Sequence, residues 1–281
     1  MNIYAIIWCA AVVLLIIILV SYHNMQLKTT KKTLVTKKLP ESFDGMKIAI
    51  ISDLHKKSFG KDNYKLIEAV KNCVPDVIFF LGDLISRFET TIKAPTKLIT
   101  SLAKIAPVYY TYGNHEVDAD ESVREEIKKL PMTCLLNGSV TIDKDGESIN
   151  IMGVYFESEY YKNKKGGYRN LPAVSAGDIN RRIGEKPDGF TLLLVHNPDY
   201  FPAYAEWGAD ITFSGHIHGG IIRIGKRGLL HPERKFLPKY TAGIYKIGDK
   251  ALALTTGLGK FRLFNASEVM LVTLKNEFPE K

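Results

Sequence analysis

Five short stretches of this sequence carry residue types that bind metal ions through nitrogen or oxygen. Imidazole, carboxylate and amide donors without a thiolate suit Mn²⁺, Fe or Zn²⁺, and their number suits two ions rather than one. Five of the seven histidines belong to this set, although a buried Asp or His at any single position also serves to cap loops and helices. In chain order the stretches are Asp53-x-His55, Asp83, Asn114-His115, His196 and His216-x-His218.

Each of the first four stretches closely follows an apolar run typical of a buried strand, and the fifth follows a similar, shorter run. Strand, polar tip and helix repeat three times, which predicts an α/β core with a largely parallel sheet. Sites in such sheets form at the carboxyl ends of the strands, so we expect the polar tips to meet. The predicted strands are Ile48–Ile51, Val77–Leu81, Val108–Tyr112, Phe190–Val195 and Ile211–Phe213, and the predicted helices are Asp62–Asn72, Pro95–Lys104 and Glu121–Lys129.

The His216-x-His218 pair lies between Ser214-Gly215 and two further glycines. Alternation along an extended segment would place both imidazoles on one side, within reach of two neighbouring ions. Gly219 and Gly220 allow the backbone to approach an ion or a phosphate closely. A packed or surface histidine pair is the competing interpretation, and the four upstream stretches favour the metal site.

A predicted hairpin and two final strands complete the expected elements: Ser139–Ile142 with Ser148–Val154, then Ala251–Thr255 and Glu268–Leu274. The polar stretch 157–182 is predicted to be a loop insertion beside the site, with a short helix over Asp178–Ile183. Its basic and aromatic residues either line an approach for a phosphate or lipid or form a solvated loop, and the sequence leaves both open. These residues are Tyr160, Tyr161, Lys162, Lys164, Lys165, Tyr168 and Arg169.

The N-terminal run from Ile3 to Tyr22 contains no charged residue. Twenty residues at about 1.5 Å each span roughly 30 Å, the thickness of a bilayer core. A cleaved signal peptide would have a basic start and a small-residue exit, which are absent, so residues 1–24 are predicted to be a single-pass anchor in the cell membrane. The segment 25–44 is predicted to be a basic linker or edge strand, and by the positive-inside rule its lysines favour the cytoplasmic side for the rest of the chain.

Composition sets broad limits on the remaining classes. The chain has 281 residues, of which 46% are apolar, so a sizeable core is expected and disorder is not. Its three cysteines form no CxxC pair and are interpreted as free thiols. A formal charge of +8 suits an anionic partner or membrane surface, and is also common without either.

The five stretches together resemble the calcineurin-like metallophosphoesterases, specifically their membrane-anchored bacterial branch. The resemblance covers 45–275 as one domain and leaves 276–281 as a tail. Asn197 and Ile221 depart from the pattern of that branch, at positions that are not metal ligands in the family. Further matching segments are His196-Asn197-Pro198-Asp199, Ser214–Gly220, Phe236–Tyr240, Gly257-Leu258-Gly259 and Arg262–Asn265.

The resemblance implies a four-layer αββα sandwich with two mixed sheets and a site for two divalent ions of manganese, iron or zinc. It implies that Asp83 bridges both ions and that His115 lies near the leaving group, which makes these two the catalytic residues. One ion would be held by Asp53, His55 and His218, and the other by Asn114, His196 and His216.

The expected activity is metal-dependent hydrolysis of a phosphodiester or pyrophosphate bond, with a lipid-linked or nucleotide-lipid substrate favoured by the anchor. The alternatives are a non-catalytic tethered binding module, which would normally have lost ligands, and a nuclease or a soluble nucleotide phosphodiesterase. Nucleic acid is not expected as a partner, because only the stretch from Tyr160 to Arg169 interleaves basic and aromatic residues. A single-zinc hydrolase would need neither Asp83 nor Asn114.

Overall fold

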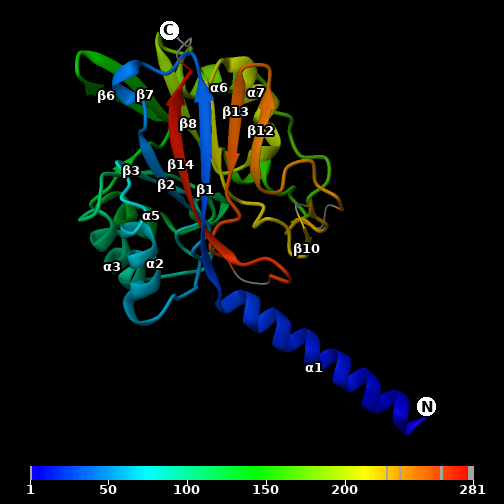
Figure 1. Ribbon diagram of the computed structural model, residues 1–281. Coiled ribbons are helices and arrows are strands. Elements are labelled where there is room, and N and C mark those ends of the chain that lie inside the picture. Colours follow the sequence, from blue (N-terminus) through cyan, green and yellow to red (C-terminus); the bar gives the residue numbers. More distant parts are fainter. Residues whose placement is uncertain (1, 226, 234–235, 260–261, 278–281) are drawn as a thin grey trace.

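A computed structural model describes residues 2–277 except 226, 234–235 and 260–261. Two six-stranded sheets form its centre (Figure 1). In the first sheet β14 is antiparallel to β2 and all other neighbours are parallel. Its order is β1 (Leu27–Thr36), β14 (Ser267–Asn276), β2 (Lys47–Ile51), β3 (Val77–Leu81), β4 (Val108–Thr111) and β5 (Thr133–Cys134).

The second sheet is also mixed, because its outer strands β12 and β6 run antiparallel to their neighbours. Its order is β12 (Gly243–Ile247), β13 (Lys250–Leu254), β9 (Ile211–Ser214), β8 (Phe190–Leu194), β7 (Glu147–Gly153) and β6 (Gly138–Lys144). A separate short ribbon pairs β10 (Arg223–Ile224) with β11 (Arg227–Gly228).

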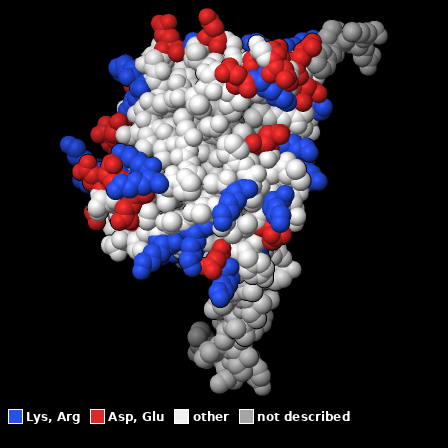
Figure 2. Space-filling view, turned by 90° about the vertical axis from the view of Figure 1, so that its left-hand side faces the viewer, with Lys and Arg blue, Asp and Glu red and all other residues white. Residues whose placement is uncertain are grey.

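Helices cover the outer face of each sheet, so the fold is the expected four-layer αββα arrangement. The helices of the first face pack on one apolar cluster, and those of the second face on another. Figure 2 shows the first face in space-filling form. The first face carries α2 (Tyr64–Lys71), α3 (Lys93–Leu102) and α5 (Glu121–Lys128), the second carries α6 (Ala176–Ile183) and α7 (Phe201–Trp207), and the short α4 (Asn114–Val117) follows β4.

The apolar core between the sheets comes from strands whose residues are buried on both faces. All five residues of β3 are buried, which is why its sequence is an unbroken apolar run. Phe79 of β3 meets Phe213 of β9 edge-on across the interface, with ring centroids 5.0 Å apart. Burial of one such side chain stabilises the fold by about 1.5–3 kcal/mol.

The sequence-based strands and helices agree with the structure to within about two residues at most ends. The strand β12 and the helix α7 were not predicted. Residues 27–36 form the edge strand β1, one of the two alternatives for the basic segment. Of the predicted tail, residues 278–281 lie outside the described residues.

The N-terminal helix α1 (Ile3–Met25) projects away from the sandwich (Figure 1). Its segment Ile3–Tyr22 is long and apolar enough to cross a membrane and none of it is buried against the domain. A signal sequence shares these properties, so α1 indicates a segment directed to a membrane, and both a retained anchor and a cleaved signal sequence agree with it.

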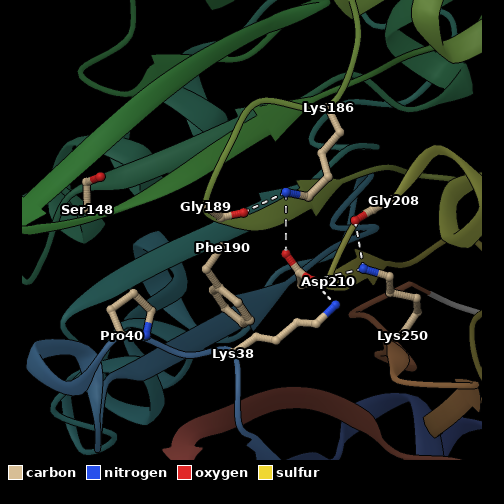
Figure 3. Close-up of a pocket in the computed structure, with 9 residues that line it drawn as sticks. All are labelled: Lys38, Pro40, Ser148, Lys186, Gly189, Phe190, Gly208, Asp210 and Lys250. Atoms are coloured by element: carbon tan, nitrogen blue, oxygen red, sulfur yellow. Dashed lines mark hydrogen bonds and ion pairs between the residues drawn. The ribbon is translucent and has the colours of Figure 1, made fainter.

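A cavity of about 510 Å³ lies where β8, β9 and β13 begin, at the end opposite the strand termini that carry the polar tips (Figure 3). Asp210 lies at its centre and is hydrogen-bonded by Lys250 Nζ at 2.9 Å and by the Thr191 backbone N–H at 2.9 Å. Lys186 donates to two backbone carbonyls, and Lys38 pairs with Asp249 at 2.6 Å. The charged groups that line this cavity pair with one another. We therefore interpret them as stabilising this end of the second sheet, and we assign no catalytic role to the cavity.

Candidate metal centre

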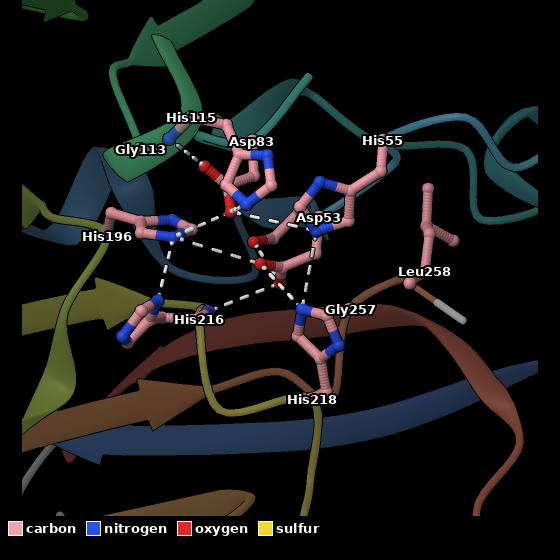
Figure 4. Close-up of polar contacts among 12 residues, drawn as sticks. Asp53, His55, Asp83, Gly113, His115, His196, His216, His218, Gly257 and Leu258 are labelled. Carbon is pink, nitrogen blue, oxygen red and sulfur yellow. Dashed lines mark hydrogen bonds and ion pairs between the residues drawn. The ribbon is translucent and has the colours of Figure 1, made fainter. Parts of the chain in front are cut away.

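The predicted donors converge on one edge of the sandwich, where strands of both sheets end (Figure 4). Asp53, Asp83 and Asn114 follow the parallel strands β2, β3 and β4 of the first sheet. His196 and His216 follow the parallel strands β8 and β9 of the second. The carboxyl ends of the two sheets therefore face one another across the site, as expected for parallel strands.

Backbone strain is concentrated at these positions. Asp53, His55, Asp83, His216 and His218 all have φ between 50° and 73°, the left-handed region that non-glycine residues rarely adopt. Each such residue costs of order 1–3 kcal/mol, which packing elsewhere must offset. The strained turns direct side chains from different strands to a common point, which is typical of a functional site.

The expectation that residues 216–218 continue an extended strand is wrong. β9 ends at Ser214, and His216 and His218 have φ of 73° and 53°. The two histidines nevertheless reach the same site because successive left-handed turns, instead of the alternation of a strand, bring them there.

The first donor group consists of Asp53, His55 and His218, whose ligand atoms all lie within 4.8 Å of one another. His218 Nε2 is 3.3 Å from Asp53 Oδ1, and 3.5 Å from His55 Nε2. Burial opposes ionisation of Asp53, yet the imidazoles of His218 and His196 lower the pKa of this carboxyl below its ordinary value. Asp53 is thus a fully buried carboxylate in contact with histidines.

The second group consists of Asp83, His196 and His216. His196 Nδ1 lies 2.7 Å from the Leu81 carbonyl, which only accepts, so Nδ1 carries a proton and Nε2 faces the site. His216 Nε2 is 3.0 Å from Glu233 Oε1, so in the same way its Nδ1 faces the site. His216 Nδ1 and His196 Nε2 are then 3.1 Å apart, and two neutral rings would direct lone pairs at each other, so this arrangement stabilises a positive charge between them, whether a proton or a metal cation.

Two further observations show that a cation fits this pocket. The buried oxygens Asn114 Oδ1 and Asp53 Oδ1 accept no hydrogen bond from any described residue, although buried polar atoms usually have a partner. Burial by itself would lower the pKa of His196, but the carboxylates of Asp83 and Asp53 raise it to about 10. The donor set thus favours positive charge at its centre, and its N and O atoms are those that divalent transition metals accept.

His115 belongs to neither of these two groups but lines the same cavity, of about 130 Å³. Its Nδ1 accepts a hydrogen bond from the Arg87 backbone N–H at 2.9 Å, so the proton of the neutral ring is on Nε2. Nε2 lies 3.9 Å from Asp83 Oδ2. Burial lowers the pKa of His115 to about 4, which keeps the ring neutral near pH 7.

Glu116 is a supporting residue whose role the sequence did not reveal. Its carboxylate accepts hydrogen bonds from the backbone N–H groups of Asp83 and Gly113, both at 2.8 Å, and of Ile85 at 3.0 Å. It therefore ties the loop after β3 to the loop after β4. Burial and the nearby Asp83 raise the pKa of Glu116. Its place in Gly113-Asn114-His115-Glu116, three residues after the helix N-cap, was the available signal.

Other cavity residues come from segments without a strong sequence pattern. Glu233 orients His216, and together with the buried His231 these three could hold a further ion by their spacing. Tyr161 and Tyr168 of the 157–182 stretch line the cavity, as expected for an insertion beside the site. Lys162 of the same stretch instead pairs with Asp118 at 2.5 Å. Only their tertiary contacts distinguish these cavity residues from the residues next to them in the sequence.

Two mixed sheets with possible metal-binding groups at one edge are expected of a metal-dependent phosphoesterase, and the comparison with known proteins agrees. The family model for calcineurin-like phosphoesterases matches residues 46–220, and the chain belongs to this family. Members bind two divalent metal ions, and the chain is a metal-dependent phosphoric ester hydrolase.

Curated relatives cover most of the chain. An uncharacterized metallophosphoesterase of Bacillus subtilis, YkuE, is 28% identical over 89% of this chain and 86% of its own length. The phosphodiesterase YaeI of Escherichia coli is 24% identical over 71% of this chain and 70% of its own. Among solved structures, a putative 5'-nucleotidase from Staphylococcus aureus shares 12% identity with a TM-score of 0.49; the match covers 85% of this chain and 56% of that one.

Proposed function

We propose that this protein is a membrane-anchored phosphodiesterase or pyrophosphohydrolase whose substrate carries a lipid. The observation that supports the activity is the close approach of two ring nitrogens, His216 Nδ1 and His196 Nε2 at 3.1 Å, beside the buried acceptors of Asp53 and Asn114. In this proposal Asp53, His55 and His218 would hold one ion, Asn114, His196 and His216 would hold the other, and Asp83 would be shared by both.

A bound pair of divalent ions supplies Lewis acidity toward the phosphoryl group and the attacking water. Asp83 suits a shared position because Oδ2 faces both donor groups, 3.6 Å from His55 Nε2 and 3.3 Å from His196 Nε2. Asp83 Oδ1 accepts the His115 backbone N–H at 2.9 Å, which fixes the carboxylate. Glu116 holds the backbone of the same loop, so the side chain is preorganised.

His115 is placed to act on the leaving group. Its Nε2–H points into the cavity while Nδ1 is held by the Arg87 N–H, so the neutral ring donates a hydrogen bond to the oxygen on which charge develops. Tyr161 is 2% exposed and packs against His216 with ring centroids 5.5 Å apart. It closes this side of the cavity to water, which strengthens the electrostatic interactions inside.

A lipid-linked substrate is supported by the apolar helix α1, which would keep the site at a bilayer. The decisive experiment assays the full chain in detergent against bis-p-nitrophenyl phosphate and a lipid pyrophosphate, after chelation and after addition of Mn²⁺ or Zn²⁺. We expect both substrates to be cleaved only with metal. Cleavage by metal-free protein would contradict the dinuclear scheme, and no cleavage of either substrate by metal-loaded protein would favour a binding module.

A further inference from the structure

The anchor helix leaves the domain at the edge that carries the metal centre. Asp53 follows the carboxyl end of β2; β14 runs antiparallel to β2, so β14 begins at this catalytic edge. β1 is parallel to β14 in register, Leu27 opposite Ser267, and therefore begins there too. Only Gln26 separates β1 from α1, and its carbonyl accepts the Ser267 N–H at 3.2 Å.

Contacts continue from this point to the site itself. Lys57 Nζ donates to Ser267 Oγ and to the Gly259 carbonyl, and Lys57 lies two residues from His55. A cavity of about 440 Å³ has the helix end Met25 in its wall together with Lys56 and Lys65. A neighbouring cavity of about 410 Å³ shares Lys56 and reaches His55. The cavity beside the anchor thus adjoins a second cavity that has the metal-centre residue His55 in its wall.

Exposed apolar side chains gather on loops at the same edge. Ile224, Phe236, Leu237 and Phe264 are 52–81% exposed. Their loops are linked by backbone hydrogen bonds, since Arg223 N donates to Leu263 O and Leu237 N to Leu229 O. Asn265 Nδ2 joins this group of loops to the His218 carbonyl. Single exposed apolar residues are ordinary, but four on linked segments at the edge where the apolar helix ends form a surface that water solvates poorly.

Positive charge accompanies the apolar loops. Lys56 and Lys65 are exposed and form no ion pair within the described part of the chain. Figure 2 shows blue side chains along the lower part of the face that carries α2, toward the end where β1 begins. Lysine close to an anionic membrane is stabilised by the negative surface potential of its lipids.

We propose that the catalytic edge rests on an anionic phospholipid bilayer. The four apolar side chains lie among the headgroups, and Lys56 and Lys65 bind lipid phosphates beside His55. The mouth of the site then opens at headgroup depth, so the substrate is a phosphate ester that remains in the membrane. This inference rests on the anchoring role of α1 in the proposed function.

The test uses the full chain in vesicles of phosphatidylcholine with phosphatidylglycerol, in a background with Cys9, Cys73 and Cys134 replaced by alanine. An environment-sensitive fluorophore is attached at Ile224→Cys or Phe264→Cys, with Val35→Cys and Val74→Cys as matched controls. Both control residues are exposed and lie at the opposite edge. We expect blue-shifted emission, and quenching by spin-labelled lipid, at 224 and 264 alone.

The lysines give an independent measurement. The double variant Lys56→Gln, Lys65→Gln is expected to lower the ratio of docked to undocked domain about fivefold per lysine, which corresponds to about 1 kcal/mol for each charge. The pair Lys71→Gln, Lys104→Gln, at the opposite edge, should leave this ratio unchanged.

Identical, water-like emission at all four labelled positions would overturn the inference. Hydrolysis of bis-p-nitrophenyl phosphate in the same vesicles reports the proposed activity separately. Lipid contact without hydrolysis would refute the proposed activity and support the docked edge. Hydrolysis without lipid contact would support the proposed activity and refute the docked edge. An N-terminal sequence that starts after α1 in the mature protein would refute both the anchor and the docked edge, and would leave the hydrolase activity intact.

Discussion

Gly215, in the loop after β9, packs directly against the loop after β2 at the metal centre. A Cβ built on this residue would lie 1.9 Å from Ser52 Oγ, 2.7 Å from Ser52 Cβ and 3.0 Å from Asp53 Oδ2. Rotation of the Ser52 hydroxyl would relieve only the first contact, because Ser52 Cβ is fixed to the backbone. Gly215→Ala must therefore push the loop after β9 away from the loop after β2.

The size of the effect follows from these distances. The second contact, which rotation of the hydroxyl does not relieve, is about 0.7 Å shorter than an ordinary contact of 3.4 Å, so a shift approaching 1 Å between His216 and Asp53 is expected. The 3.2 Å hydrogen bond from His216 N to Asp53 Oδ2 would break. Overpacking of this kind costs about 1–3 kcal/mol. A misplacement of about 1 Å at a catalytic centre lowers turnover by about 100-fold.

The assay measures phosphodiester hydrolysis, bound metal by plasma mass spectrometry and the midpoint of thermal unfolding. Gly138→Ala is the matched control, because its Cβ would meet no atom within 4 Å. Ser52→Gly combined with Gly215→Ala should regain part of the lost activity, since it removes the two shortest contacts. Wild-type activity and metal content in Gly215→Ala would refute the reasoning.

Three further substitutions separate the roles of residues around the site. Asp83→Asn should abolish turnover and lower bound metal, measured by mass spectrometry, while circular dichroism shows a retained fold. His115→Ala should lower kcat by about 10²–10⁴-fold with metal content unchanged, because in the proposed function His115 acts on the leaving group; a lower metal content would contradict this role. Glu233→Gln should weaken metal binding about 10–100-fold, measured by calorimetric titration, because His216 loses its charged orienting partner; unchanged affinity would remove Glu233 from the site.

Much of the first sheet could be predicted from the sequence because local signals there agree. β3 coincides with the predicted strand Val77–Leu81, since a strand buried on both faces must be apolar throughout. The polar residue that follows each such strand was conspicuous for the same reason. Parallel strands end at one edge, so the meeting of Asp53, Asp83 and Asn114 followed from chain order.

The sequence by itself therefore determined the succession of apolar strands and polar residues along the chain, the candidate donor residues and the apolar helix. Each of these features depends on residues that are neighbours in the chain. Only the tertiary structure decided which atoms meet. The left-handed turns at His216 and His218, the Glu116 clamp and the Glu233 partner all depend on contacts between distant segments. The position of α1 at the catalytic edge was likewise decided by the parallel pairing of β1 with β14. In this pairing Leu27 lies opposite Ser267, which is 240 residues further along the chain, and no local sequence pattern encodes such a contact.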